Sequence, residues 1–167
     1  MTGCQGGISL TIAGYLFTVR AGAGNKLFGG SMIGVLIITH GDLGRELIKA
    51  AEMIRGNMEG VFPVSVDATK AVDDVKKEIT SAIKKADYGN GVLILTDLFG
   101  GTPSNISLSF LKEKKVEVVT GVNLPMLLKI PDMRRRRKLA ESADFIRDYG
   151  RKNIYLASEL LNRKADS

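Results

Sequence analysis

The chain has 167 residues, of which 44% are hydrophobic and 25% are charged, and its mean hydropathy is +0.05. These values predict one soluble globular domain with a sizeable core, in a chain too short for two comfortable domains. The only cysteine, Cys4, excludes an intramolecular disulfide, and the only histidine, His40, excludes a zinc site built from several Cys and His ligands. We therefore expect a cytoplasmic protein with no metal and no cofactor.

The formal net charge of +6 is unevenly distributed along the sequence. Arg20 and Lys26 supply two of these charges, and much of the remaining excess lies in the run Arg134-Arg135-Arg136-Arg137-Lys138. A nucleic-acid-binding surface needs basic residues spread over a face and interleaved with aromatic rings, so we expect no nucleic-acid partner. The run predicts a solvated turn or an exposed helix start, with docking to an acidic partner surface or an anionic ligand as the alternative.

Residues 1–31 differ in kind from the rest of the chain, because they are rich in glycine and contain no acidic residue. The apolar segment 8–19 is too short to span a bilayer. Together with Ala21-Gly22-Ala23 it resembles the apolar part and cleavage site of a secretory signal, but no basic region precedes it and Arg20 interrupts the approach to the cleavage site. We interpret residues 1–31 as a disordered extension or a mis-assigned start, with native translation beginning at Met32. Residues 32–158 would then form the domain, and residues 159–167 a polar tail.

From Met32 onward, apolar runs typical of buried strands alternate with amphipathic helical patterns, as a parallel sheet requires. The predicted strands span residues 33–39, 61–66, 92–96 and 116–120. The predicted helices span residues 43–54, 73–86, a segment from 105 to about 111, and 139–149. We interpret Gly89-Asn90-Gly91 as a turn and Asp42 as the N-cap of the first helix. The pattern predicts an α/β fold with a central, mostly parallel sheet.

Polar, glycine-rich sequence follows three of the predicted strands, at His40-Gly41, at residues 97–105 and at residues 121–123. In a parallel sheet these strand ends project from the same edge, so we expect them to converge. An imidazole is a nucleophile through its unprotonated nitrogen, and a carboxylate bonded to the other N–H fixes the tautomer. Asp97 is the candidate for that carboxylate.

The turn Gly100-Gly101-Thr102-Pro103 has the features of a phosphate-binding turn. Glycines let backbone amides approach an anion, a helix N-terminus favours negative charge, and the Thr102 hydroxyl adds a donor. No nucleotide-binding motif is present, so a phosphoryl group is the better candidate ligand. Each feature also has a structural interpretation: His40 can be a satisfied structural residue, Asp97 can cap a turn, and Thr102 can be an N-cap before Pro103.

In order and spacing, Thr39-His40-Gly41, residues 96–105 and residues 121–127 resemble the IIA component of the mannose-type sugar phosphotransferase system. The resemblance covers about residues 32–157. It implies an α/β domain of three layers, with helices on both faces of the sheet. It also implies a homodimer in which a C-terminal antiparallel strand at the sheet edge crosses to the partner, and residues 154–157 match that strand.

The resemblance further implies that His40 accepts a phosphoryl group from phospho-HPr and passes it to a IIB component, which acts with a membrane permease of IIC and IID subunits. It makes Asp97 the hydrogen-bond partner of His40. Thr102 and the amides of Gly100 and Gly101 become the phosphate contacts. The site rim contains Phe99, where many members have an aromatic residue such as Trp, and Asn123.

Two other classes of function stay open. One is a regulatory phosphoacceptor of the same fold, or the phosphoryl donor of a dihydroxyacetone kinase, which differs only in the downstream acceptor. The other is a phosphoglycerate-mutase-like phosphatase or a chelatase with a histidine after its first strand. The mutase-like class expects Arg before the histidine and a second histidine, whereas this chain has Thr39 and no other histidine.

Overall fold

The computed structural model describes residues 8–12, 15–19, 32–67, 69–111 and 115–159, and the chain divides into two compact units, Met1–Gly30 and Ser31–Ser167. In the first unit, β1 (Ile8–Ile12) pairs antiparallel with β2 (Tyr15–Val19). Both strands are rich in β-branched and aromatic residues, which favour extended backbone. The start at Met32 and the division into domains stay predictions. The rest of the extension and the tail from residue 160 lie outside the described residues.

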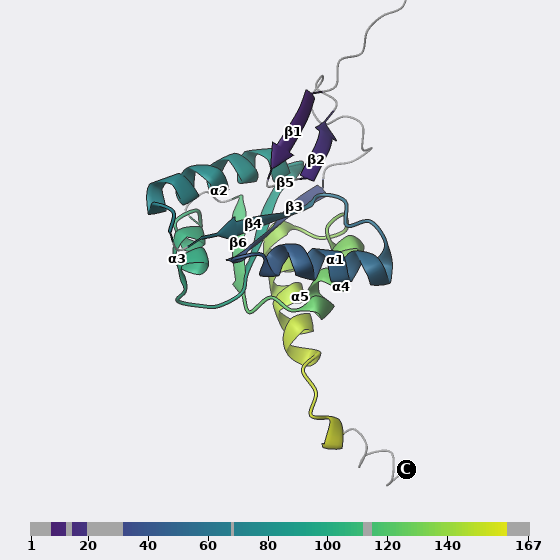
Figure 1. Ribbon diagram of the computed structural model, residues 1–167. Helices are drawn as coiled ribbons and strands as arrows, with labels where there is room; N and C mark the ends of the chain where they lie inside the picture. The colour runs from purple at the N-terminus through teal and green to yellow at the C-terminus, as the bar shows by residue number, and fades with distance from the viewer. Residues whose placement is uncertain (1–7, 13–14, 20–31, 68, 112–114, 160–167) are drawn as a thin grey trace, which may run out of the picture. The chain divides into compact units, whose positions relative to one another are not determined.

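The second unit contains a four-stranded parallel sheet of order β4-β3-β5-β6, as predicted. Its strands are β3 (Met32–His40), β4 (Val61–Val66), β5 (Gly89–Thr96) and β6 (Val116–Thr120). Its helices are α1 (Leu43–Arg55), α2 (Val72–Ala86), α3 (Thr102–Leu108), α4 (Leu124–Met133) and α5 (Leu139–Lys152). Helices α2 and α3 cover one face of the sheet, and α1, α4 and α5 cover the other (Figure 1).

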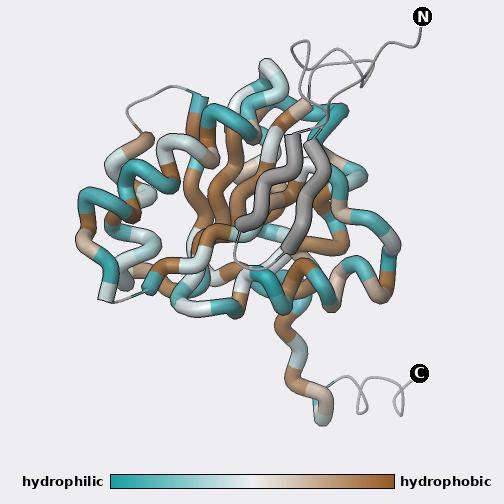
Figure 2. Tube along the Cα trace, turned by 45° about the horizontal axis from the view of Figure 1, so that its top comes forward, coloured by the Kyte–Doolittle hydropathy of each residue, from teal (hydrophilic) through white to brown (hydrophobic). Residues whose placement is uncertain are grey.

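The two faces of the sheet carry separate apolar clusters. In β3, residues 32–39 are all buried, and the odd-numbered Ile33, Val35 and Ile37 pack with α1, α4 and α5. The alternate Leu36 and Ile38 pack with α2. This two-residue alternation is the side-chain period of a strand, and the strands accordingly form the hydrophobic centre of the unit (Figure 2). The prediction of a three-layer α/β fold is confirmed.

The order of the strands creates a crevice at one edge of the sheet. From β3 the chain passes through α1 to β4, then through α2 back across β3 to β5. Since crossovers between parallel strands are right-handed, connections in opposite directions place their helices on opposite faces. The loops that leave β3 and β5 therefore diverge, and ligands of such sheets bind at this point. His40 ends β3, and Asp97 follows the last residue of β5.

Two local structures differ from the sequence prediction. Helix α4 was not expected, because Pro125 and Pro131 both lie within it. Pro125 occupies the first turn, where a missing amide is harmless, and the Asn123 side chain caps the helix by accepting a bond from the Met126 amide at 3.2 Å. The predicted turn at residues 89–91 is wrong, since these residues begin β5 while Asp87 Oδ1 accepts bonds from the amides of Gly89 and Gly91.

The basic run after α4 is also not uniformly solvated, so the predicted solvated turn is wrong for Arg134. Its side chain is only 5% exposed, and Nη2 lies 3.7 Å from Glu59 Oε2. Its carbonyl accepts a hydrogen bond from the Ile33 amide at 3.1 Å. Arg134 thus joins the end of α4 to the start of β3, whereas the three arginines that follow it are exposed.

The C-terminal segment forms no strand within the single chain. Residues 154–156 have no regular secondary structure, and the side chains of Ile154, Tyr155 and Leu156 are 75%, 63% and 62% exposed. An antiparallel strand here needs hydrogen-bond partners that the segment's own chain does not supply. The predicted edge strand is therefore absent from the monomer, and its exchange between two chains stays a prediction.

We predict that Gly34→Ala destabilises the sheet strongly. A Cβ at this buried position of β3 would lie 1.8 Å from the carbonyl oxygen of Ala86, which is backbone and cannot rotate away. Overpacking of this kind lowers the free energy of unfolding by about 3 kcal/mol. Urea denaturation followed by circular dichroism measures the loss. Ser81→Ala, on the exposed face of α2, is the control and should change the free energy by less than about 0.5 kcal/mol. Equal midpoints for the two variants would contradict the close packing of β3 against α2.

Candidate functional site

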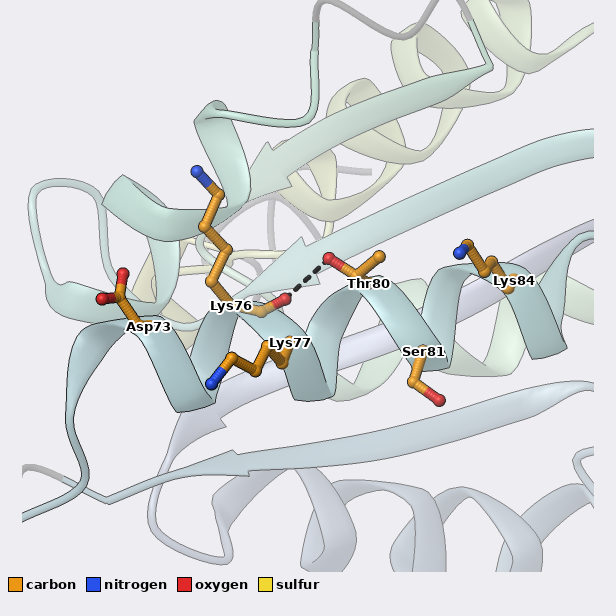
Figure 3. A pocket seen from close by; sticks show the side chains of 6 residues that line it. All are labelled: Asp73, Lys76, Lys77, Thr80, Ser81 and Lys84. Atoms are coloured by element: carbon orange, nitrogen blue, oxygen red, sulfur yellow. Dashed lines mark hydrogen bonds between the residues drawn. The ribbon is translucent and has the colours of Figure 1, made fainter.

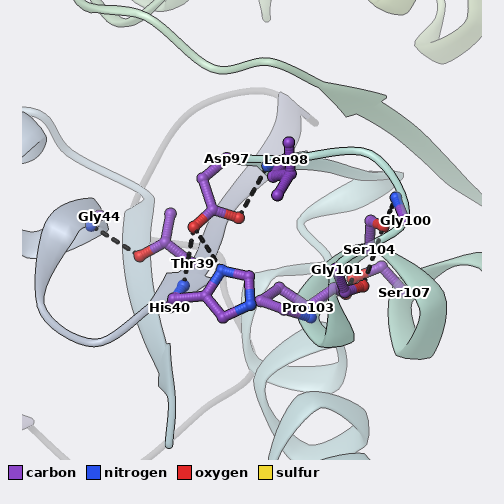
Figure 4. A network of polar contacts seen from close by, with 10 residues as sticks. All are labelled: Thr39, His40, Gly44, Asp97, Leu98, Gly100, Gly101, Pro103, Ser104 and Ser107. Atoms are coloured by element: carbon purple, nitrogen blue, oxygen red, sulfur yellow. Dashed lines mark hydrogen bonds and ion pairs between the residues drawn. The ribbon is translucent and has the colours of Figure 1, made fainter. Parts of the chain in front are cut away.

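The ends of the two central strands meet through a hydrogen-bonded pair. Asp97 Oδ2 lies 2.8 Å from Nδ1 of His40 and also accepts a bond from the His40 backbone amide at 2.9 Å. The other oxygen, Oδ1, accepts a bond from the Leu98 amide at 2.8 Å. The Asp97 side chain is 12% exposed, whereas the His40 side chain is 47% exposed (Figure 4). The carboxylate is thus fixed from three directions, and the imidazole it holds faces solvent.

This geometry determines which ring nitrogen of His40 is available. A carboxylate accepts hydrogen bonds, so Nδ1 carries the proton that lies toward Asp97, and in the neutral ring the lone pair is on Nε2. Figure 4 shows the Nε2 side of the ring directed toward the start of α3. A Cβ on Gly101 would lie 2.7 Å from Cε1 and 3.3 Å from Nε2 of the ring. The imidazole therefore lies directly against the Gly101 backbone, and in this orientation of the ring there is no room for a side chain at that position.

The turn between β5 and α3 is fixed by its own hydrogen bonds. Gly100 has a φ of +84°, in the region that favours glycine. Its amide donates to Ser104 Oγ at 3.0 Å, and that hydroxyl donates to the carbonyl of Gly101 at 3.1 Å. Asn105 Nδ2 donates to the carbonyl of Gly100 at 3.0 Å. The Gly100 amide was predicted to donate a hydrogen bond to the phosphate, but it already donates to Ser104.

Ser104 has a role in this turn that the sequence analysis missed. Its side chain is fully buried and connects two consecutive glycines of the turn. A serine in the first turn of a helix often forms a hydrogen bond with the backbone of the preceding loop, and its position after Gly100-Gly101 is the sequence feature from which this role could have been predicted. The turn leaves Gly101 beside the imidazole and the Thr102 side chain exposed at the start of α3.

The loop on the other side of His40 is held by Thr39. Its buried hydroxyl accepts a bond from the amide of Gly44 at 2.8 Å, which satisfies an amide in the first turn of α1. Asp42 occupies the N-cap position, as predicted, but its side chain makes no capping bond. That carboxylate instead accepts a bond from Ser65 Oγ at 3.2 Å. His40 therefore lies between two anchored loops.

The two residues predicted for the site rim are placed differently. Phe99 is 72% exposed next to Leu98, which is 61% exposed, so the loop that follows Asp97 presents apolar side chains to solvent. Asn123 is half-buried, and besides capping α4 it donates through Nδ2 to the carbonyl of Gly150 at 3.1 Å. Both polar groups of Asn123 thus have partners within the chain, and the side chain connects α4 with α5.

Asp97 is ionised over a wide pH range. Burial would raise the pKa of its carboxyl, but hydrogen bonds from the backbone and side chain of His40 and from the Leu98 amide together bring the pKa below its ordinary value. An ionised partner can stabilise positive charge that develops on the imidazole when its other nitrogen reacts. The pair has the arrangement of a nucleophilic histidine with an orienting carboxylate.

Other features of the described residues offer no competing site. No group of three or more His, Cys, Asp or Glu residues is placed to hold a metal, and no helix in the described part of the chain could cross a membrane. The surface hollow of about 560 Å³ on the outer face of α2 is lined by one helix alone (Figure 3). Its lining residues are Asp73, Lys76, Lys77, Thr80, Ser81 and Lys84. Side chains of a single helix do not converge on a ligand from several directions.

Comparison with known proteins gives consistent matches. A family model described as the PTS system fructose IIA component matches residues 34–147. The fructose-specific EIIA component of Bacillus subtilis is 29% identical over 133 residues, which cover 79% of this chain and 91% of that protein. The mannose-specific EIIAB component of Escherichia coli is 34% identical over 97 residues, which cover 58% of this chain and only 30% of that longer protein.

A solved structure agrees with these matches. The phosphotransferase system component EIIA from Streptococcus agalactiae superposes with a TM-score of 0.68 at 28% identity, over 77% of this chain and 99% of that one. The similarity in fold therefore extends over almost the whole of a solved EIIA protein.

We predict that Asp97 makes the protein sensitive to acid. A carboxyl whose pKa is lowered by folding stabilises the protein above its unfolded pKa of about 3.9, and that stabilisation is lost as the pH falls through the lower folded pKa. Between about pH 5 and about pH 2, the free energy of unfolding should thus decrease more for the wild type than for Asp97→Asn. Urea titrations at several pH values measure the difference. Ser81→Ala, on the exposed face of α2, removes no titratable group, so it is the control and should keep the wild-type pH dependence. Parallel curves for the wild type and Asp97→Asn would contradict the assigned interaction.

Proposed function

The chain belongs to the IIA family of the sugar phosphotransferase system, and we propose that it carries a phosphoryl group on His40 between phospho-HPr and a IIB component. The observation that supports this role most strongly is the His40–Asp97 pair, which leaves Nε2 free at an exposed position. The same pair would serve a regulatory phosphoacceptor or a donor to dihydroxyacetone kinase, which differ in the acceptor alone. Family membership favours all of these over a mutase-like phosphatase.

The transfer step requires only the two imidazoles and a fixed geometry. The Nε2 lone pair of His40 attacks the phosphorus of phospho-HPr, a new N–P bond forms, and the N–P bond to the HPr histidine breaks, with its electron pair returning to that imidazole. The transition state is loose and in line, so positioning and charge stabilisation supply most of the catalysis. Asp97 does both for His40, since it holds Nδ1–H and opposes the positive charge on the ring. The bonds broken and formed are of the same kind, so transfer onward to IIB can be reversible.

The transferred group would lie between the imidazole and the start of α3. Gly101 is adjacent to Nε2, and the Thr102 hydroxyl is exposed at the first residue of the helix. Amides of a first helical turn have no intrahelical acceptor and attract anions. We therefore assign the phosphate contacts to the Gly101 amide and Thr102, with Gly100 acting through the shape of the turn because its amide donates to Ser104.

The partner proteins would complete the site by excluding water from the transferring group. The exposed apolar side chains of Leu98 and Phe99, in the loop after Asp97, and of Leu43 at the start of α1 offer the partner a surface to cover. The Escherichia coli relative is named an EIIAB component, and an A and a B component joined in one protein fit direct transfer between them. A protein with these roles would act in the cytoplasm and be connected through IIB to a IIC and IID permease. Exchange of the exposed residues 154–156 between two chains would give a homodimer.

We predict that His40→Ala abolishes phosphorylation. Incubation with phosphoenolpyruvate, enzyme I and HPr should give the wild type an acid-labile, base-stable phosphate on Nε2, whose position NMR of the phosphorylated ring identifies. Asp97→Asn should keep the fold but accept phosphate about 10²-fold more slowly, because the amide no longer fixes the reactive tautomer. Adding purified IIB should then remove the label from the wild type. Ser81→Ala is the control and should react as the wild type does. Label on His40→Ala, attachment at Nδ1, or undiminished transfer in Asp97→Asn would refute the assigned roles.

We predict that Gly101→Ala impairs transfer without unfolding the domain. The added methyl group would overlap Cε1 of His40, and the exposed ring can move away by rotating. A displacement of this size slows phosphoryl acceptance by about 10²-fold while changing the free energy of unfolding by less than about 1 kcal/mol. Ser81→Ala, on the exposed face of α2, is the control and should leave the rate unchanged. A wild-type rate for Gly101→Ala would show that the phosphoryl group does not approach along this side of the ring.

A further inference from the structure

The basic run after α4 leaves two guanidinium groups without an acidic partner. Arg134 is buried against Glu59, and Arg135 lies 3.7 Å from the same carboxylate. Arg136 and Arg137 are exposed, and no carboxylate of the described residues lies within 4 Å of either. Water solvates an exposed arginine, so the lack of an acidic partner alone does not indicate a binding site. Both side chains, however, line the same groove.

The groove lies between α4 and α5 and has a volume of about 470 Å³. Its lining residues are Lys129, Asp132, Met133, Arg136, Arg137, Glu141 and Phe145. The two carboxylates already have partners. Asp132 is bonded to Lys129 at 3.0 Å and to Arg55, and the hydrogen bond from Lys129, with a smaller contribution from Arg55, holds its pKa below the ordinary value. Glu141 accepts a bond from the Lys138 amide at 3.4 Å. The lining therefore carries three positive and two negative charges, and the guanidinium groups of Arg136 and Arg137 are the ones with no carboxylate within 4 Å among the described residues.

One of these guanidiniums is oriented before any partner binds. The Arg137 guanidinium lies over the Phe145 ring, 4.3 Å from its centroid. Phe145 in turn stacks on Tyr149 at 6.0 Å, and Lys129 lies 5.7 Å from the Tyr149 centroid. Stacking occupies the face of a guanidinium and leaves its N–H edge free to pair with an anion. Because less side-chain freedom is lost on binding, such an arginine is a better anchor than a free one.

The groove is far from the phosphoryl-transfer site. Arg134 is bonded to Ile33 at the start of β3, and His40 is at the other end of that strand. Seven residues of extended strand separate these ends by about 23 Å. A protein bound in the groove would therefore leave His40 accessible.

We propose that the groove between α4 and α5 docks a carboxylate-rich segment of a partner protein, with Arg136 and Arg137 as its anchors. Guanidinium groups pair with carboxylates through two parallel hydrogen bonds, which suits discrete acidic side chains. Separate acidic side chains on a flexible segment can reach Arg136 and Arg137 while staying away from the carboxylates of Asp132 and Glu141, whereas the evenly spaced charges of a phosphate backbone or a lipid surface cannot. The docking goes beyond the proposed phosphoryl transfer and uses none of its residues.

A hexaglutamate peptide is a direct probe of this surface. In NMR titrations of the full chain at about 50 mM salt, its shifts should be confined to α4, α5 and their connection, and binding should weaken as salt is raised. The double variant Arg136→Gln with Arg137→Gln should bind about tenfold more weakly. Arg136→Lys with Arg137→Lys keeps the charge but loses the two-bond pairing, so its affinity should be intermediate. The control, Arg147→Gln with Arg151→Gln, removes two arginines of α5 outside the groove and should bind as the wild type does.

Three results would overturn the proposal. The first is no binding by the wild type, or shifts outside the groove. The second is tighter binding of duplex DNA or of phosphatidylserine vesicles at the same salt, lost in the same double variant. The third is slower phosphorylation of that double variant by phospho-HPr, which would make the groove part of donor docking. Failure of the peptide to bind while His40 is still phosphorylated would leave the proposed transfer function intact.

Discussion

The double hydrogen bond from His40 to one oxygen of Asp97 is the interaction on which the site depends. That oxygen accepts both the backbone amide and the ring nitrogen of the same residue, so it fixes the histidine at two points. Such an arrangement requires β3 and β5 to end at nearly the same position along the strand direction. The parallel register that pairs Ile38 with Thr96 provides this, because His40 and Asp97 then follow within two residues on neighbouring strands. A shift of register would separate the pair.

The surrounding structure holds this pair at the surface without burying it. Thr39 anchors the loop on one side through Gly44, and Ser104 anchors the glycine turn on the other. The Thr96 carbonyl also accepts bonds from the amides of Gly121 and Val122, which ties the loop after β6 to the same strand end. The buried sheet therefore supplies rigidity, and the loops supply exposure. A proposed carrier that must meet two different proteins needs both properties at one residue.

The sequence predicted the sheet well, because strands such as β3 and β5 are continuous apolar runs bounded by glycine and polar residues. It also predicted that His40 and Asp97 would meet, since that follows from parallel topology. Helix α4 could not be recognised with the same ease, because Pro131 normally ends a helix and only tertiary packing of Leu127 and Ile130 overrides it.

Side-chain roles set by tertiary partners were the least predictable. Arg134 has the same sequence context as the exposed arginines after it, and its burial depends on Glu59, which is distant in the chain. Asn123 looks like a polar residue at a strand end, yet both of its polar groups bind within the chain. The cap to Met126 is local, but the bond from Asn123 to Gly150 and the contact between Arg134 and Glu59 join residues far apart in the sequence, which local pattern does not specify. The division of the basic run into a buried Arg134 and the exposed Arg136 and Arg137 has a functional consequence. Arg134 packs at the start of β3, while Arg136 and Arg137 present positive charge to solvent. Both parts of the run lie at the end of β3 opposite to His40.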